Sequence, residues 1–232
     1  HRHAALVHGR GVWMNNPAQG LEDLGAYVEL QCASHFSLLR GASSPGELFD
    51  QAQRLGYRAL ALCDRNSLAG LVRAHSAAKA TGVRRIVGCE LVLREGMTVL
   101  VYPTDRPAYG RLCRLLSLGK SRAGKGACDI DLSDLAAHAQ GLIAILVPDR
   151  PDAACAVQLK KLKAVFGPEA HVALTLHRRP GDALRLHELE ALARAAGVTP
   201  VVTNRVLFHD KDRRLLQDVV TCIRENTTID DV

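Results

Sequence analysis

Seven apolar runs of strand length alternate along this chain with segments of helical periodicity, and this alternation limits the folds that the chain can adopt. Runs such as ALALC, LIAILV and TPVVT are continuously apolar. Such runs are typical of strands that are buried on both faces of a parallel sheet. Because helices must cover those faces, the sequence predicts an α/β fold.

After residue 25, apolar runs of strand length alternate with helical patterns. Strands are predicted at residues 27–31, 59–63, 85–93, 98–102, 142–147, 171–176 and 199–203, and helices at residues 45–56, 67–81, 107–118, 132–139, 152–166, 181–196 and 210–224. Seven strands, each followed by a helix, fit a closed βα barrel better than an open sheet.

The helix ends carry their own sequence signals. Ser44 and Glu47 have the spacing of a capping box, with a proline between them at the first helical position. Gly56, Gly82 and Gly197 directly follow predicted helices, where a residue in the left-handed conformation ends the helix. These signals support the boundaries that the periodicity predicts.

The chain of 232 residues is long enough for one large α/β domain. Residues 1–25 contain Gly, Pro and Asn and little periodicity, so they are predicted to form an N-terminal extension or arm. Residues 26–232 are predicted to form a single domain.

The seven cysteines are odd in number, scattered, and contain no CxxC pair. Reduced thiols are therefore expected rather than disulfides or zinc ligands, which indicates a cytoplasmic protein. No apolar run reaches membrane-spanning length, and the N-terminus lacks a signal-peptide core. We therefore expect no membrane association.

The net charge of +6 is compatible with a nucleic-acid partner and equally with a basic, solvated surface. Residues 120–126, KSRAGKG, form a basic, Gly-rich stretch that predicts a surface loop, and they lack the spacing of a phosphate-binding P-loop. Whether this loop meets DNA, a protein or only water stays open at the level of sequence.

Three regions carry a resemblance to a known family. They are SHFSLLRGASSP at residues 34–45, ALCDRNSLAG at 61–70 with IVGCELVL at 86–93, and AYGRLCRLLS at 108–117. They resemble the PHP (polymerase and histidinol phosphatase) domain of bacterial C-family DNA polymerase α subunits, and within that group the error-prone, ImuC-type paralogue. The resemblance covers residue 26 to the C-terminus and implies a distorted (βα)7 barrel of the PHP type.

In that family, histidines and carboxylates at the strand ends bind two or three metal ions, which generate hydroxide and clamp a phosphate. The resemblance places the corresponding metal-site positions on Gln31, Ala33, Arg40, Asp64, Arg65, Glu90, Arg205 and Leu207. Of these, only Asp64 and Glu90 keep a ligand of the expected type. The metal site is therefore predicted to be degenerate.

The replacements argue against metal chemistry. Arg40, Arg65 and Arg205 would repel a divalent cation, at roughly 4 kcal/mol per unit of like charge at about 4 Å and an effective dielectric of about 20. They are expected to form ion pairs with Asp64 and Glu90 instead. We predict no catalytic residue, no metal and no cofactor in this segment. His35 and His177 are weak candidates for metal ligands.

The resemblance implies a non-catalytic PHP domain of an error-prone DNA polymerase that acts in damage-induced translesion synthesis. Its expected partners are a polymerase core in the same protein, DNA through that polymerase, and other mutasome proteins. This segment alone is predicted to be inactive. Two alternatives stay open, namely an active metal-dependent phosphoesterase with ligands such as His35, Asp64, Glu90 and His177, and a free-standing interaction module.

Overall fold

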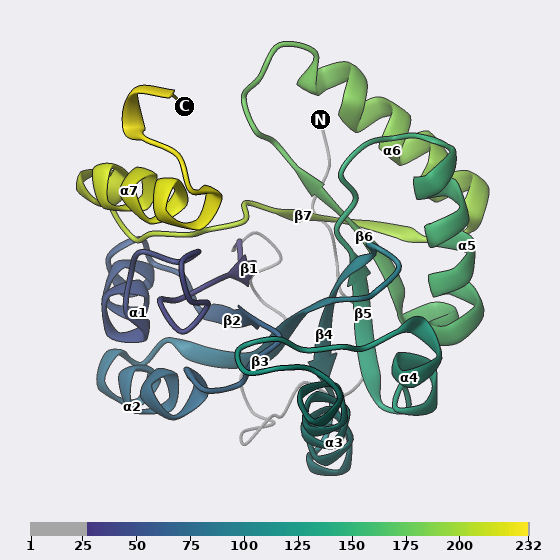
Figure 1. Cartoon of the computed structure of the whole chain (residues 1–232), viewed down its shortest axis with the longest axis horizontal. Coiled ribbons are helices and arrows are strands. Elements are labelled where there is room, and N and C mark those ends of the chain that lie inside the picture. Colours follow the sequence, from purple (N-terminus) through teal and green to yellow (C-terminus); the bar gives the residue numbers. More distant parts are fainter. Residues whose placement is uncertain (1–26, 232) are drawn as a thin grey trace. The chain divides into compact units, whose positions relative to one another are not determined.

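The computed structural model describes residues 27–231, along which seven strands and seven α-helices follow one another (Figure 1). The described residues form two compact units. We call residues 27–90 with 204–231 the first unit and residues 91–203 the second unit. All the predicted strands and helices are present, with ends that differ by a few residues. The arm predicted at residues 1–25 lies outside the described residues.

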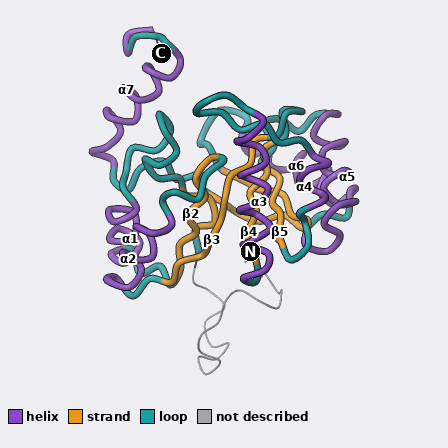
Figure 2. The backbone as a smooth tube through the Cα atoms, turned by 60° about the horizontal axis from the view of Figure 1, so that its bottom comes forward, coloured by secondary structure: helices purple, strands orange, loops and turns teal. Residues whose placement is uncertain are grey.

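The first unit contains three parallel strands with helices between them. Its elements are β1 (Glu29–Cys32), α1 (Pro45–Arg54), β2 (Ala59–Arg65), α2 (Leu71–Thr81), β3 (Arg84–Val92), which continues into the second unit, and α7 (Arg214–Glu225). β2 pairs in parallel with both β1 and β3. Helices α1 and α2 lie next to each other beside β2 and β3 (Figure 2).

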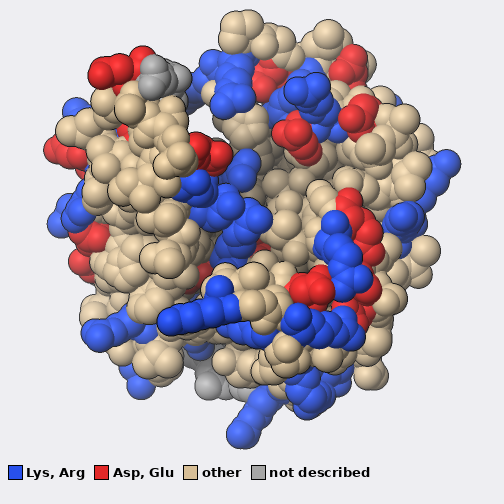
Figure 3. All heavy atoms as spheres, viewed as in Figure 1, with Lys and Arg blue, Asp and Glu red and all other residues tan. Residues whose placement is uncertain are grey.

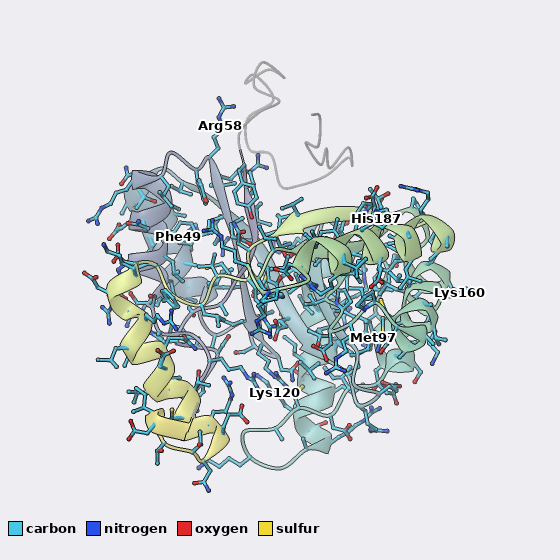
Figure 4. The ribbon with its side chains drawn as sticks, turned by 90° about the horizontal axis from the view of Figure 1, so that it is seen from above. Phe49, Arg58, Met97, Lys120, Lys160 and His187 are labelled. Carbon is cyan, nitrogen blue, oxygen red and sulfur yellow. The ribbon has the colours of Figure 1, made fainter. Side chains whose placement is uncertain are left out.

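The core of the first unit lies between α1, α2 and the strands. Phe49 is fully buried and points from α1 toward the strands (Figure 4). Leu60 and Leu62 of β2 pack in the same cluster, together with Ala74 of α2. Burial of a large apolar side chain stabilises a fold by about 1.5–3 kcal/mol. The continuous apolar run of β2 therefore accounts for its central place.

The predicted capping box of α1 is confirmed. The backbone N–H of Glu47 donates to the hydroxyl of Ser44 at 3.3 Å, and the backbone N–H of Ser44 donates to the Glu47 carboxylate at 2.8 Å. Gly82 ends α2 in the left-handed conformation with φ +74°, as the sequence predicts.

The second unit contains four strands and four helices. They are β4 (Thr98–Pro103), α3 (Arg106–Arg122), α4 (Leu132–Ala137), β5 (Leu142–Leu146), α5 (Ala153–Phe166), β6 (Ala170–Thr175), α6 (Asp182–Ala196) and β7 (Thr199–Thr203). β5, β6 and β7 are parallel neighbours, and α5 packs against β5, β6 and α6. Here too the apolar strands lie under helices.

The prediction that every strand is followed by a helix is wrong at one point. β3 and β4 are joined by a tight turn at residues 93–97, in which the N–H of Leu93 donates to the carbonyl of Met97 at 2.9 Å. A parallel crossover needs a dozen or more residues, so this connection is too short for one. β4 in turn runs antiparallel to β5, while two helices, α3 and α4, fill the connection between them.

The cysteines agree with the free thiols that the sequence predicts. All seven cysteines have reduced thiols, and five of them are buried, including Cys63 and Cys89. Cys113 is only half-buried, because its side chain lies on the partly exposed side of α3. Within residues 27–231, no helix has both the length and the apolar character needed to cross a membrane.

Candidate functional site

Residues 204–209 run alongside β1 in the first unit. Val206 forms a parallel bridge with Cys32. The N–H of Val206 donates to the carbonyl of Gln31 at 2.8 Å, and the N–H of Ala33 donates to the carbonyl of Val206 at 2.9 Å. This pairing brings together the positions of Gln31, Ala33, Arg205 and Leu207.

A β-bulge sets the direction of β1 before this bridge. Glu29 is paired with Leu60, and Cys32 with Leu62, so β1 advances three residues while β2 advances two. The extra residue makes the strand bend and leaves a backbone donor outside the ladder. The N–H of Gln31 donates to the Glu29 carboxylate at 2.6 Å, which satisfies this donor.

Glu29 is a buried acid next to these positions that the sequence reasoning missed. Its carboxylate is buried and accepts hydrogen bonds from the Tyr27 hydroxyl at 2.8 Å and from the backbone N–H of Asn204 at 3.2 Å. Burial raises the pKa of Glu29, and these hydrogen bonds oppose the shift. Glu29 therefore ties β1 to the start of the 204–209 segment. An acid inside the apolar run YVELQC was the available signal.

Asp64, at the end of β2, is the centre of a hydrogen-bond network. Its carboxylate accepts from the backbone N–H of Ser34 at 2.8 Å, from the Ser34 hydroxyl at 3.0 Å and from the Ser37 hydroxyl at 2.7 Å. The Ser37 hydroxyl in turn accepts from the N–H of Arg65 at 2.9 Å. Burial raises the pKa of Asp64, and the serine hydrogen bonds oppose the shift.

Two glycines make this network possible. A Cβ atom on Gly70 would lie 2.5 Å from an Asp64 carboxylate oxygen. A Cβ atom on Gly41 would lie 2.3 Å from the carbonyl oxygen of Ser34. Real Cβ atoms do not approach that closely, so both positions require glycine. The loop at residues 34–43 can fold onto Asp64 only because these two side chains are absent.

Three of the positions that the resemblance assigns to metal ligands are arginines. Burial, followed by the positive charges of Arg65 and Arg224, lowers the pKa of Arg40. Glu90 opposes the shift, and Arg205 adds to it. The structure thus brings together the three arginines that the sequence predicted at the site. It adds Arg224 of α7, which the sequence reasoning did not include.

The backbone around these arginines has unusual conformations. Leu39, Asn66 and Arg205 all have positive φ, at 56°, 48° and 52°. Non-glycine residues rarely adopt such angles, and they are often found at functional sites. Hydrogen bonds hold two of these turns, since Arg224 donates to the carbonyl of Leu39 at 3.0 Å and the N–H of Asn66 donates to the carbonyl of Glu90 at 2.7 Å.

The expected ion pairs with Asp64 and Glu90 are not formed within the first unit. The Asp64 carboxylate is bound by serine hydroxyls and a backbone amide instead. Glu90 has no ion pair within residues 27–90 and 204–231, and its charge acts on Arg40 without direct contact. The loop at residues 34–43 supplies the hydrogen-bond donors to Asp64, namely the Ser34 N–H and the hydroxyls of Ser34 and Ser37. The Asp64 carboxylate therefore bonds to serines and not to arginines.

The two histidine candidates are exposed and belong to different units. The ring of His35 lies against Phe36 with a centroid distance of 4.8 Å, and the Asp64 oxygens are occupied by the serines. His177 follows β6 in the second unit, where Asp182 accepts a hydrogen bond from its backbone. The charge of His35 acts on Asp64, but the hydrogen bonds to the Asp64 carboxylate come from Ser34 and Ser37.

The residues at the family's metal positions do not fit a divalent metal cluster. Alanine and leucine at 33 and 207 offer no ligand atoms, three positions are arginine, and Asp64 is already satisfied by hydrogen bonds. Metal ions of this kind require several imidazole or carboxylate ligands. Across residues 27–231, no group of three or more His, Cys, Asp or Glu side chains is arranged to hold a metal ion.

Comparison with known proteins shows that the chain is similar to one segment of several bacterial error-prone DNA polymerases. The error-prone DNA polymerase of Allorhizobium ampelinum is 59% identical over 206 residues, which are 89% of this chain and 19% of that protein. Error-prone DNA polymerase 2 of Rhizobium meliloti is 60% identical over 206 residues, again 89% of this chain and 19% of that protein. The chain thus spans about a fifth of the length of the relatives it matches.

Solved structures support the fold. A Bifidobacterium adolescentis protein named as a metal-dependent phosphoesterase has a TM-score of 0.54 and 13% identity, over 81% of this chain and 89% of that one. A Chromobacterium violaceum amidohydrolase, solved with bound sulfate and no metal, also has a TM-score of 0.54, with 18% identity over 79% of this chain and 88% of that one. At such identities the likeness shows the fold alone.

The family follows from a direct match. Residues 29–197 match the family model described as the PHP domain. This matched range includes both Asp64 and Glu90. The predicted α/β fold of the PHP type is therefore confirmed, and the chain belongs to the PHP domain family.

Proposed function

We propose that this chain is a catalytically silent PHP domain of an error-prone DNA polymerase, and that it serves that polymerase as a structural module in damage-induced translesion synthesis in the cytoplasm. Identities of 57–60% to several error-prone DNA polymerases support the polymerase context. No metal ion or other cofactor takes part, and contact with DNA is made through the polymerase.

The observation that supports a catalytically silent site is the set of hydrogen bonds to the Asp64 carboxylate. In a working metal centre its carboxylate would face the ions, whereas here it accepts from three donors of the loop at residues 34–43. A buried carboxylate that is held in this way acts as an anchor for a loop. The retained acid therefore has a structural role that needs no metal, and without metal-bound hydroxide the family's hydrolysis has no nucleophile.

Helix α7 presents an apolar face that supports the structural role. Exposed on it are Leu215, Leu216, Val219 and Ile223, with exposed fractions of 65%, 41%, 40% and 61%. Their spacing of three, four and eight residues puts them on one side of the helix. Figure 3 shows mostly uncharged side chains over α7. We assign the polymerase core of the same protein as the partner that covers this face.

The silent site is tested by metal content and hydrolysis. The intact chain, purified without added metal, should contain no stoichiometric zinc or manganese by elemental analysis. It should also leave phosphomonoesters and single-stranded DNA intact when zinc or manganese is supplied. Stoichiometric metal that is lost in Glu90→Ala, or hydrolysis that depends on Asp64, would contradict the proposal.

The structural role is tested by charging the α7 face. Leu215→Glu with Ile223→Glu should leave the stability of this domain within about 0.5 kcal/mol, because both side chains are largely exposed. In the polymerase, the same variant should expose the boundary of this domain to limited proteolysis and lower synthesis. Val72→Glu on α2, with an exposed fraction of 76%, is the matched control. If the control and the α7 variant behave alike, α7 is not the contact.

A further inference from the structure

The arginine cluster of the first unit, defined as Arg40, Arg65, Arg205 and Arg224, has more positive charge than its neighbours balance. The side chains of Arg40, Arg65 and Arg205 form no ion pair or hydrogen bond with any residue of the first unit. Arg224 is paired with Glu225 at 2.8 Å. Glu90 is the acid whose charge acts on Arg40.

The cluster is held in place by its backbone. Arg40 lies at the end of the loop that Asp64 anchors, and its N–H donates to the carbonyl of Ser37 at 2.9 Å. Arg65 ends β2 and is paired in register with Glu90 of β3. The guanidinium of Arg224 donates to the carbonyl of Leu39, the residue next to Arg40, at 3.0 Å. Hydrogen bonds therefore hold the backbone positions from which these side chains extend before any ligand arrives.

Holding like charges together without a counter-ion is unfavourable. Like charges that lie close together repel, and the repulsion grows where the surroundings are less polar than water. Burial, together with the charges of Arg65 and Arg224, lowers the pKa of Arg40. Even so, a guanidinium stays charged at neutral pH. A bound anion would remove the repulsion, and several guanidinium groups suit an anion with more than one charge.

We propose that the arginine cluster binds a phosphate group of a phosphate-bearing ligand, and that guanidinium groups hold it without any metal ion. Arginine presents a planar fork of donors that matches two phosphate oxygens at once, which a lysine cannot do. Arg205 is exposed and Arg40, Arg65 and Arg224 are only half-buried, so a ligand can reach them. Phosphate binding goes beyond the proposed function, since a catalytically silent domain need not bind a ligand.

The test is a titration of the intact chain with inorganic phosphate and pyrophosphate in the presence of EDTA. Binding is followed by calorimetry for the natural sequence and for the variants Arg40→Gln and Arg65→Gln. Each substitution should weaken binding by about tenfold, the equivalent of one charge-assisted hydrogen bond. Arg205→Gln is a second variant with little risk to folding, because its side chain is exposed.

Arg58→Gln is the matched control. Arg58 is exposed at the opposite end of β2, about 23 Å from Arg65 at 3.3 Å per residue, and it projects away from the chain (Figure 4). It removes the same charge from the same unit but should leave phosphate binding unchanged. Equal losses in Arg58→Gln and the cluster variants would mean that only the net charge matters, and would overturn the proposal. So would an absence of binding.

Two sources of the phosphate group are distinguished with single-stranded DNA. A 5′-phosphorylated oligonucleotide that binds better than its 5′-hydroxyl form, and that pyrophosphate displaces, identifies a terminal phosphate of DNA. Binding of phosphate and pyrophosphate with no preference between the oligonucleotides identifies a free phosphate compound. Failure of all these probes would refute the phosphate site but leave the silent site untouched, because EDTA excludes metal and no hydrolysis is measured.

Discussion

Substitutions of Asp64 can distinguish an anchoring role from a metal-binding role. A metal ligand needs the negative charge of the carboxylate, whereas a loop anchor needs only its hydrogen-bond acceptors. Replacement by asparagine keeps one oxygen at the position that accepts from Ser34 and Ser37. The second oxygen accepts only from the Ser34 hydroxyl, at 3.0 Å, and that hydroxyl can turn to accept from an amide instead. We therefore expect Asp64→Asn to fold and Asp64→Ala to be strongly destabilised.

The magnitude follows from the donors that lose their acceptor. In Asp64→Ala, the buried N–H of Ser34 and two serine hydroxyls lose the oxygen to which they donate. One stranded buried amide costs about 1–3 kcal/mol, and each lost hydroxyl bond about 0.5–1.5 kcal/mol. Because the buried charge also disappears, the net loss should be about 3 kcal/mol. For a chain of this size that lowers Tm by roughly 6–12 °C.

The free energy of unfolding should depend on pH through Asp64, and the direction of that dependence can be checked. Since burial raises the pKa of Asp64, the folded chain binds this proton more tightly than the unfolded chain. Its contribution to the free energy of unfolding is full below about pH 3.9 and is lost as the pH rises through the folded-state pKa. Asparagine cannot titrate. The stability of Asp64→Asn relative to the natural chain should therefore increase with pH across that window and then level off.

The assay is urea unfolding of the natural chain and both variants between pH 4 and 8, with amide hydrogen exchange of residues 34–40 as a local measure. Exchange should accelerate in Asp64→Ala and stay close to the natural rate in Asp64→Asn. If Asp64→Asn loses as much stability as Asp64→Ala at neutral pH, the charge itself is required. A cation rather than serine hydroxyls would then hold this carboxylate, and the anchoring argument would fail.

Three further substitutions test neighbouring parts of the site, two by the same unfolding measurements and one by an NMR titration. Gly41→Ala should cost about 1–3 kcal/mol, since its Cβ would lie 2.3 Å from a backbone oxygen, whereas Gly46→Ala meets nothing closer than 3.8 Å and should be neutral or stabilising. Glu29→Gln should lose about 2 kcal/mol, because its new amide would face hydroxyl and N–H donors; an unchanged stability would refute that role. Ser37→Ala should raise the pKa of Asp64 further, and an unchanged value in an NMR titration would contradict the network.

Much of the fold was predictable because each element depends on its own residues. The continuous apolar run of β2 and the capping box at Ser44 and Glu47 act over a few positions, so they could be recognised without tertiary contacts. The antiparallel step at β4 was missed, although the short segment at residues 93–97 contained the signal. Length alone excluded a crossover helix there.

The site was predictable only in part. The family resemblance located Arg40, Arg65 and Arg205, and the structure brings these positions together. It did not indicate Arg224, which comes from α7, more than a hundred residues after Arg65 in the sequence. Nor did it show that serines rather than arginines satisfy Asp64. Such choices depend on distances between side chains that are remote in sequence.

The amino-acid sequence by itself determined the α/β class, the order of the elements and the reduced cysteines, since these depend on local pattern or residue identity. Only the tertiary structure decided which side chains surround the positions that the family resemblance assigns to metal ligands. The bulge at Glu29, the bridge between Cys32 and Val206, and the loop folded onto Asp64 all involve contacts across long stretches of chain. Hydrogen bonds and charges at such contacts depend on angstrom-scale positions, which residue order does not contain.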